Sequence, residues 1–339
     1  MAGDLVVMQA SRRPRPTTNP YNVMLCNGLQ EASGVRLEFF SWPRAILGRF
    51  DVFHVHWPEL LVGGHRRSGR AVRQALTALF ALRLAVTRRP VVRTVHNLHP
   101  PEGLSRSQRA LLRALDRLTT LRILINETTP VPDGQATALV LHGDYRPWFR
   151  RFPSGEREPG QIAYFGSIRR YKSVDRLLAA FRESDDPRLR LVVAGKPSTP
   201  ELAASTSSLA GNDPRIELAL RFVPDDELVS LVSRSSLVCL PYRHMHNSGS
   251  VLAALSLGRP VLVPANDANR RLAEEVGEDW VILFEDELTG RDLEDAVARA
   301  DALPSGALPD LSLRGWDVGI AGHVEAYRRA AAIRRGDVA

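Results

Sequence analysis

The sequence is nearly devoid of lysine and cysteine. Its 339 residues include two lysines, Lys172 and Lys196, and two cysteines, Cys26 and Cys239. Two cysteines far apart in apolar runs exclude a disulfide framework and a zinc-type spacing, so we expect two buried free thiols in a reducing compartment. Aromatic residues make up only 6% of the chain. A nucleic-acid surface needs a continuous basic stripe with aromatic partners, so no nucleic acid is expected.

Long apolar runs are missing as well. The longest candidate, residues 75–86, is too short to cross a bilayer and contains Arg83. The amino terminus has no basic stretch followed by a long apolar one, so no signal peptide is expected. These absences predict a cytoplasmic protein with at most a peripheral membrane contact.

The composition that remains is that of a folded α/β protein with a basic surface. Apolar residues make up 44% of the chain and charged residues 24%, and the formal net charge is +7. All but two of the 45 basic residues are arginine, whose planar and permanently charged side chain suits phosphate groups. This balance favours phosphorylated substrates or an anionic membrane face as partners.

Short β-branched runs alternate with amphipathic stretches, a pattern typical of doubly wound α/β sheets. Strands are predicted at 4–10, 35–42, 51–57, 90–97, 121–126, 160–166, 189–195, 215–223, 236–242, 259–265 and 281–286. Helices are predicted at 68–86, 105–117, 173–184, 225–234, 250–257, 269–276, 290–302 and 316–335.

A Pro- and Gly-rich segment at 147–160 interrupts the alternation and predicts two Rossmann-like domains. The first comprises residues 1–152 together with the last helix, 316–335, which is expected to cross back onto it. The second comprises residues 153–315. The carboxyl ends of the two sheets are expected to face each other across a ligand cleft.

The stretch YFGSIRRYKS at 164–173 joins a strand to a helix through a strongly basic loop. The strand ends at Gly166, and Arg169, Arg170 and Lys172 follow within the loop. Fixed cations at the carboxyl edge of a sheet can hold a diphosphate. The alternative is a solvated turn before a surface helix.

The stretch HMHNSGSVLAALSLGRP at 244–260 begins as a polar loop and continues as an apolar helix. Ser248 or Ser250 suits the helix N-cap, and Gly249 permits close approach of a ligand to the backbone. The free N–H groups of the first turn form an anion site. The alternative is an ordinary capped helix with a polar entry loop.

Together, GSIRRYK and NSGSVLAALSLGRPVLVP resemble the carboxyl-terminal half of the GT-B glycosyltransferases of group 1, also called family 4. The family pattern is Gly-Arg-Leu-x-x-x-Lys, followed by Glu-x7-Glu before a Cys-Gly-Lys/Arg-Pro-Val turn. Gly166 and Lys172 match the first element, whereas Ser167 replaces its arginine. In register with the final turn, the two glutamates fall on Met245 and Ala253 and are absent.

The sequence is also similar to a divergent bacterial branch of these enzymes through the signatures HVHWPE, HN-x-x-P-x-E and NSG. Members of this branch act in exopolysaccharide and glycolipid assembly, and some are β-mannosyltransferases. The resemblance covers most of the chain. It implies transfer of a hexose, with mannose or glucose favoured, from a GDP- or UDP-sugar to a lipid-linked or saccharide acceptor. No tightly bound cofactor is implied. The donor residues it implies are Gly166, Ser167, Arg169, Lys172, Asn247, Ser248, Gly249 and Ser250.

The missing glutamates keep a degenerate, non-catalytic nucleotide-sugar-binding protein open as an alternative. A phosphorylase of this superfamily would be longer and would hold pyridoxal phosphate on a lysine, of which the chain has two. The sequence leaves the donor base, the sugar, the acceptor and the anomeric outcome open.

Two stretches of the first domain offer acid–base chemistry. The strand at 51–57 runs on to Glu59, and the strand at 90–97 is followed by Glu102. An inverting transfer needs a base within reach of the acceptor hydroxyl, so both glutamates are candidates, with Glu102 preferred. Each can instead be a capping or salt-bridged residue. The family resemblance assigns His96 to the donor sugar.

His54 lies inside its strand and is expected to be structural. Asn19, Tyr21 and His56 are candidate acceptor contacts, although Asn19 can equally be a helix N-cap. No His, Cys or Asp cluster has a metal-ligand spacing, so no metal is predicted. The arginine-rich stretch 63–90 reads either as a basic amphipathic helix that rests on anionic lipid or as a core-packed helix with a solvated basic face.

Overall fold

The computed structural model describes residues 4–15, 18–64, 67–98, 100–101, 103–243 and 245–337. The chain forms two compact units, one of Met1–Gly143 with Leu313–Ala339 and one of Asp144–Ser312. The division at Gly143 precedes the boundary expected at residue 152. The reason is local, because the Tyr145 N–H already donates to Ser256 Oγ of the second unit at 2.8 Å.

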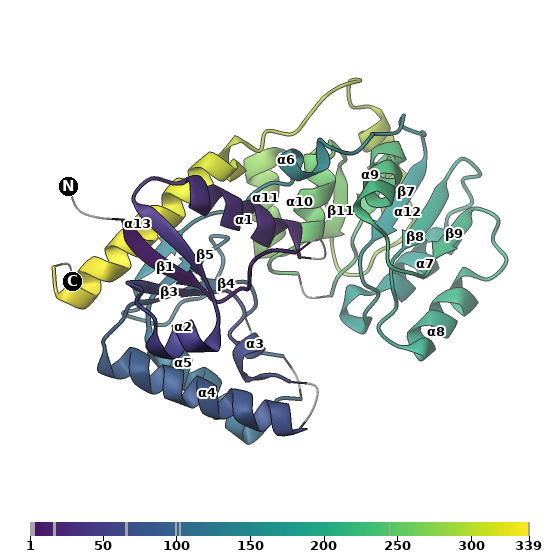
Figure 1. The fold of residues 1–339 in the computed structure, drawn as a ribbon. Helices are drawn as coiled ribbons and strands as arrows, with labels where there is room; N and C mark the ends of the chain where they lie inside the picture. The colour runs from purple at the N-terminus through teal and green to yellow at the C-terminus, as the bar shows by residue number, and fades with distance from the viewer. Residues whose placement is uncertain are drawn as a thin grey trace. The chain divides into compact units, whose positions relative to one another are not determined.

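The first unit contains a six-stranded sheet in which all neighbouring strands are parallel (Figure 1). In spatial order its strands are β2 (Val35–Phe39), β1 (Leu5–Gln9), β3 (Val52–Val55), β4 (Val91–Val95), β5 (Thr119–Leu124) and β6 (Thr137–Leu139). Its helices are α1 (Pro20–Glu31), α2 (Trp42–Leu47), α3 (Glu59–Val62), α4 (Arg67–Val86), α5 (Arg106–Arg117) and α13 (Trp316–Arg335).

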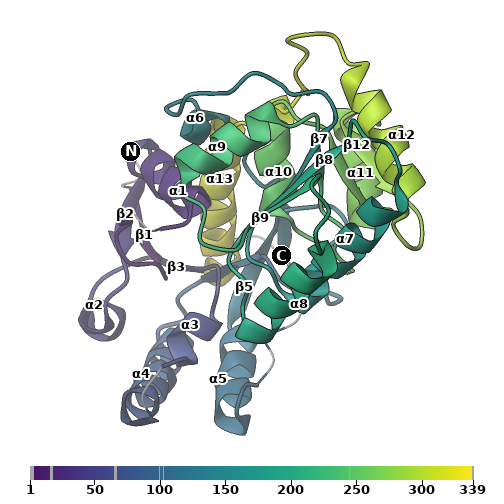
Figure 2. The ribbon, with the colours of Figure 1, turned by 90° about the vertical axis from the view of Figure 1, so that its right-hand side faces the viewer.

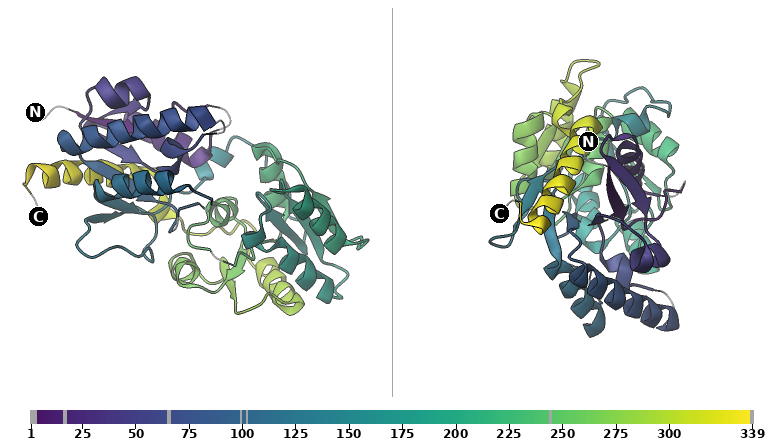
Figure 3. Two further views of the ribbon diagram at one scale, coloured as in Figure 1. Left: turned by 90° about the horizontal axis from the view of Figure 1, so that it is seen from below. Right: turned by 60° about the vertical axis from the view of Figure 1, so that its left-hand side comes forward.

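The pleat of the first sheet sends alternate residues to two different cores. Met8 and Phe53 belong to an apolar cluster with Phe80 of α4 and Leu115 of α5. Helices α4 and α5 therefore cover this face, side by side in Figures 1 and 3. The next residues along the strands point to the opposite face, where α1 and α13 pack. The last helix thus belongs to the first unit, which confirms the sequence-based prediction.

The second unit repeats the plan with another six-stranded parallel sheet. In spatial order its strands are β12 (Val281–Phe284), β11 (Val261–Pro264), β10 (Leu237–Cys239), β7 (Gln161–Phe165), β8 (Arg190–Ala194) and β9 (Ile216–Ala219). Its helices are α6 (Arg146–Phe149), α7 (Val174–Glu183), α8 (Pro200–Ala210), α9 (Asp225–Arg234), α10 (Gly249–Ser256), α11 (Asp267–Val276) and α12 (Gly290–Asp301). The 3-10 turns are η1 (Arg170–Lys172) and η2 (Ser312–Arg314).

The order of strands in each sheet reverses at one point. In the second sheet, β7, β8 and β9 follow in one direction and β10, β11 and β12 in the other, so the reversal lies between β7 and β10. Right-handed crossovers then require helices on opposite faces, and Figure 2 shows α7 and α8 on one side of the strands and α9 and α10 on the other. The reversal in the first sheet lies between β1 and β3. The carboxyl ends of these strand pairs are where ligands bind in such sheets.

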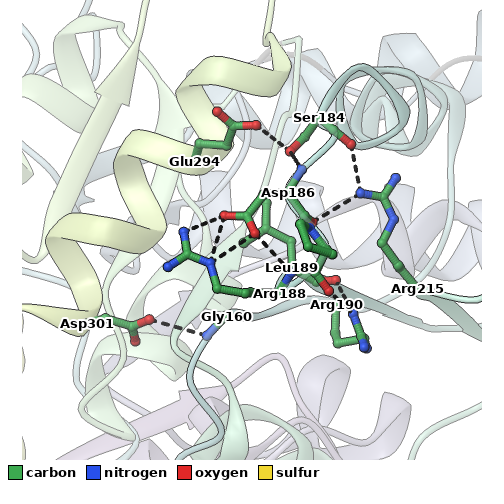
Figure 4. A network of polar contacts seen from close by, with 10 residues as sticks. Gly160, Ser184, Asp186, Arg188, Leu189, Arg190, Arg215, Glu294 and Asp301 are labelled. Atoms are coloured by element: carbon green, nitrogen blue, oxygen red, sulfur yellow. Dashed lines mark hydrogen bonds and ion pairs between the residues drawn. The ribbon is translucent and has the colours of Figure 1, made fainter.

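The amino end of the second sheet is fixed by a polar network around the turn between α7 and β8 (Figure 4). Asp186 forms a bidentate ion pair with Arg188, with 2.6 Å between Oδ2 and Nη2. Arg215 donates to the Ser184 carbonyl at 2.7 Å, and Ser184 Oγ donates to Glu294 of α12. This network stabilises the end of the sheet remote from the carboxyl edge.

The elements that the sequence analysis missed are short or lack periodicity. They are α2, α3, β6, α6 and α8, whereas α1 was expected only through its candidate N-cap, Asn19, without a range. The longer elements agree with their predicted ranges to within a few residues, and α9 and α13 agree at both ends. Both cysteines are buried and free, as predicted.

Gly195, which follows β8, lies against the backbone of Gly166, which follows β7. A Cβ atom there would overlap the Gly166 carbonyl oxygen, which is backbone and cannot rotate away. Gly195→Ala is expected to destabilise the protein by about 1–3 kcal/mol through this overlap. Urea unfolding measures the change. Gly319→Ala is the matched control, since no atom lies within 4 Å of its added Cβ in α13 and alanine favours the helix by up to about 1 kcal/mol. Equal stability of the two variants would contradict the close approach.

Candidate functional site

The reversal point of the second sheet brings together loops that are far apart in sequence. Gly166 follows β7 with a φ of +112°, a conformation that favours glycine. A Cβ atom built on Gly166 would lie 3.3 Å from Lys172 Nζ and 3.7 Å from Ser250 Oγ. The backbone after β7, the lysine of η1 and the first turn of α10 therefore converge on one point.

Lys172 is a buried cation at this point. Only 8% of the residue is exposed, and Nζ lies 4.7 Å from the centre of the Tyr242 ring. In the part of the chain that the structure describes, no carboxylate pairs with this ammonium group. Burial, and secondarily the charge of Arg169, lower the pKa of Lys172 to about 8. A charged amine with a π-face but no carboxylate beside it suits an anionic ligand.

The first turn of α10 adds hydrogen-bond donors. Ser248 is the N-cap and accepts the Val251 N–H at 3.4 Å, while the amides of Gly249 and Ser250 have no intrahelical acceptor. A Cβ atom on Gly249 would lie 2.9 Å from the Tyr145 hydroxyl, so this position also depends on glycine. The helix dipole makes these amides favourable to negative charge.

Tyr242 is a functional candidate that sequence reasoning missed. Its ring contacts the Lys172 ammonium, and its hydroxyl lies 3.5 Å from Ser250 Oγ, so it connects the two anion-binding loops. The available signal was its position three residues after the end of β10, at the reversal point of the sheet.

The remaining predicted donor residues lie around this centre. Ser167 is exposed, and its carbonyl accepts the Tyr164 hydroxyl at 3.3 Å. Asn247 is half-buried in the turn before the N-cap. Arg169 is exposed and lines a pocket of about 410 Å³ beside α8. Met245 and Ala253, which stand where the family has glutamates, are both buried.

The reversal point of the first sheet is rich in buried histidine. His54 in β3 is fully buried and hydrogen-bonded on both ring nitrogens. Tyr327 of α13 lies 2.7 Å from Nδ1, and Thr94 Oγ1 lies 2.8 Å from Nε2. These contacts agree with the structural role expected for His54. Burial is the first cause that lowers its pKa, so the imidazole is neutral.

His56 and His96 form a hydrogen-bonded pair at the carboxyl ends of β3 and β4. The distance from His56 Nδ1 to His96 Nε2 is 2.9 Å. Burial lowers the pKa of both rings, followed by repulsion from neighbouring histidines, so both are neutral. The Trp57 indole stacks on His96 with 4.4 Å between ring centres and 18° between planes. His96 is thus oriented by hydrogen bonding and by stacking.

Beside this pair lies a pocket of about 410 Å³ that we call the Trp57 pocket. Its walls come from the β3–α3 turn, from β4 and the loop that follows it, and from one face of α5. It is lined by His56, Trp57, Pro58, Glu59, Arg93, His96, Asn97, Leu98, Pro100, Arg109, Leu112, Arg113 and Asp116.

Glu59 is the candidate base that the structure describes. It lines the Trp57 pocket at the first residue of α3, and partial burial raises the pKa of its carboxyl group. A raised pKa makes a carboxylate a stronger proton acceptor. The other candidate, Glu102, lies outside the described residues.

The predicted acceptor contacts have structural partners of their own. Asn19 is the N-cap of α1, and its Oδ1 accepts the Tyr21 N–H at 2.9 Å. Tyr21 is buried, with its ring against His96 and His142. Of the three predicted contacts, His56 alone lines the Trp57 pocket.

The outer face of α4 is apolar, contrary to the expectation of a solvated basic face. Two of its arginines contact neighbouring carbonyls, since Arg73 donates to the Leu60 carbonyl at 3.2 Å and Arg83 to the Ala45 carbonyl at 2.6 Å. The exposed residues along this face are Ala71, Val72, Ala75, Ala78, Leu79, Leu82, Ala85 and Val86. We call them the α4 stripe.

No group of three or more His, Cys, Asp or Glu residues among the described residues is arranged to hold a metal ion. No helix in the described ranges has the length and apolar character needed to span a membrane.

The chain is similar in sequence to known glycosyltransferases. The chain is 43% identical over 312 residues to a GDP-mannose:glycolipid 4-beta-D-mannosyltransferase of Xanthomonas campestris pv. campestris. The similarity covers 92% of this chain and 88% of that protein. Residues 159–300 match the family model described as glycosyl transferases group 1.

Two solved structures share the fold at low identity. A glycosyltransferase involved in avilamycin A biosynthesis has a TM-score of 0.55 and 15% identity, covering 98% of this chain and 97% of that one. An α,α-trehalose-phosphate synthase (UDP-forming) from Burkholderia vietnamiensis has a TM-score of 0.60 and 13% identity, covering 98% of this chain and 100% of that one.

Proposed function

Because the chain belongs to the group 1 family of glycosyltransferases and has the GT-B fold, we propose that it transfers mannose from GDP-mannose to a glycolipid. The observation that carries this proposal is the buried Lys172 ammonium beside Gly166 and Ser250, which suits the diphosphate of a nucleotide sugar. The identity of sugar and base follows the 43% identical relative, whose name specifies GDP-mannose.

In this proposal the second unit binds the donor. Lys172 and Arg169 offset the diphosphate charge, and the amides of Gly249 and Ser250 donate hydrogen bonds to its oxygens. Gly166 leaves room for the phosphates against the backbone, while Ser167, Asn247 and Ser248 complete the donor site. These groups also stabilise the GDP that leaves, whose charge grows as its bond to the sugar breaks.

The first unit binds the acceptor and activates it. The sugar of GDP-mannose is α-linked, so β-transfer inverts the anomeric carbon and requires a base. We assign that role to Glu59, which takes the proton of the acceptor hydroxyl while the hydroxyl oxygen bonds to the anomeric carbon and GDP departs. His96, neutral and held by His56, is assigned to the donor sugar. Asn19 and Tyr21 support the acceptor site from α1.

A glycolipid acceptor requires access to a membrane surface, and the α4 stripe suits that contact. Between Val72 and Val86 the helix rises about 21 Å, and the residues exposed along it are alanine, valine and leucine. A helix face of this kind lies in the interface between headgroups and acyl chains. Arg88, next to its end, is exposed and suits anionic headgroups. Free, buried cysteines fit the reducing cytoplasmic side of that membrane.

The donor site is tested with the only two lysines of the chain. Lys172→Met is expected to weaken GDP-mannose binding at least tenfold, because a charge-assisted contact is lost. Its stability at pH 7 should not fall, since burial lowers the pKa of Lys172 and the charged form therefore opposes folding below about pH 8. Lys196→Met, at an exposed lysine, is the matched control.

Isothermal titration with GDP-mannose and UDP-glucose, together with thermal melting, measures both effects. Unchanged GDP-mannose affinity in Lys172→Met would refute the diphosphate site. A wild-type protein that binds UDP-glucose but not GDP-mannose would refute the proposed donor.

The base is tested by comparing its two candidates. Glu59→Gln is expected to lower kcat by about 10²–10⁴-fold with little change in GDP-mannose affinity, because the amide cannot accept the proton. In the wild type, kcat/KM should rise with pH through the raised pKa of Glu59, since the ionised form is the active one. Glu102→Gln is made in parallel. Loss of turnover in Glu102→Gln with retention in Glu59→Gln would reverse the assignment.

The membrane contact is tested by flotation with vesicles of phosphatidylethanolamine and phosphatidylglycerol. The wild type should float with the vesicles, and Leu79→Ser/Leu82→Ser should bind at least tenfold more weakly. Leu308→Ser/Leu313→Ser removes two leucines elsewhere that are 71% and 60% exposed, against 47% and 61% for Leu79 and Leu82, and should bind like the wild type. A wild type that stays with the unbound fraction, or a stripe variant that floats equally well, would refute the contact.

A further inference from the structure

We propose that the Trp57 pocket is the subsite for the acceptor's sugar ring, with the Trp57 indole as its stacking platform. The inference rests on the proposed function, because it concerns the acceptor of that reaction. It adds a residue that family membership does not assign and a second contact surface for the sugar, the ion pair formed by Arg93 and Asp116.

The pocket has the depth to hold a sugar ring. One wall is a single face of α5, formed by Arg109, Leu112, Arg113 and Asp116 at helical spacing. From Arg109 to Asp116 the helix rises about 10 Å. A volume of about 410 Å³ lies within the range of small-molecule sites.

Trp57 is held in place for stacking. His96 covers one face of the indole at 4.4 Å between ring centres, and the half-buried Trp57 lines the pocket. His96 is itself fixed by its hydrogen bond to His56 and by the edge of Tyr21, whose ring centre lies 5.4 Å away. A rigid indole loses little conformational entropy when a ligand binds.

The chemistry of the indole face matches one side of a pyranose. Several C–H groups of a sugar ring point to the same side and form an apolar patch, and an aromatic face is flat, apolar and partially negative. Glu59 lies two residues after Trp57 on the same turn and lines the same pocket. A ring stacked on Trp57 would therefore lie beside the proposed base.

Polar groups suited to hydroxyls line the same pocket. Arg93 forms an ion pair with Asp116, which also pairs with Arg122 at 2.9 Å. The side chains of Arg93 and Asp116 remain 25% and 40% exposed, so both keep surface for a ligand. A guanidinium donates to sugar oxygens and a carboxylate accepts from sugar hydroxyls. One apolar platform and one polar pair are the two surfaces that a sugar ring needs.

Ligand-observed NMR tests the inference on the full-length protein without donor chemistry. The probes are the methyl glycosides of glucose, mannose, galactose and glucuronic acid, and saturation transfer at increasing concentrations gives each Kd. The wild type should bind at least one of them. Trp57→Leu should weaken that binding at least tenfold, whereas Trp57→Phe, which keeps a smaller aromatic face, should lose less.

Trp42→Leu is the matched control, because Trp42 is a partly exposed tryptophan of the same unit that packs against Phe40 outside the pocket. It should bind the glycoside like the wild type. Failure of the wild type to bind any of the four glycosides, or equal binding by Trp57→Leu, would overturn the inference. GDP-mannose binding is measured on the same samples by thermal shift. If the wild type does not bind GDP-mannose but still binds a glycoside in a way that depends on Trp57, the proposed function is refuted and the sugar subsite is not.

Discussion

The buried ammonium group of Lys172 is the constraint on which the functional interpretation depends. Charged amines are costly to bury, and this one has an aromatic face beside it but no carboxylate among the described residues. The fold holds the ammonium group in this buried position: the Tyr242 ring packs against it, and Gly166 has no side chain that would crowd it. An anion bound beside the ammonium would offset this cost, and in the proposed function that anion is the diphosphate of the donor.

The first unit, by contrast, has neutral side chains at the reversal point of its sheet. His54, His56 and His96 are buried and neutral; His54 is hydrogen-bonded to Tyr327 and Thr94, and His56 is hydrogen-bonded to His96. Neutral imidazoles form a rigid polar frame that adds no charge beside an acceptor. Glu59 lies in the pocket beside His56 and His96, and desolvation raises its pKa, while its backbone hydrogen bond and the charge of Arg93 act in the opposite direction. In the proposed mechanism the two units therefore separate charge stabilisation from proton transfer.

Much of this architecture could be predicted from the sequence, because buried parallel strands are continuous β-branched runs and their connections carry helical periodicity. The basic loop at 169–172 and the polar entry to α10 were identifiable for the same reason, since both follow such strands. Tyr242, Trp57 and the exposed face of α4 were not. Their roles depend on which face of an element meets another, and a count of arginines in 63–90 could not show that Arg73 and Arg83 donate to neighbouring carbonyls.

The central claim is tested most directly by titrating the lysines themselves. With ¹³C-labelled lysine, the two Cε signals are assigned by Lys196→Met and followed by NMR as pH rises. The account predicts that Lys172 titrates near pH 8 in the free protein, and that GDP-mannose moves this midpoint upwards while leaving Lys196 unchanged. Titration of both lysines near the ordinary value of 10.5, with neither responding to GDP-mannose, would contradict it.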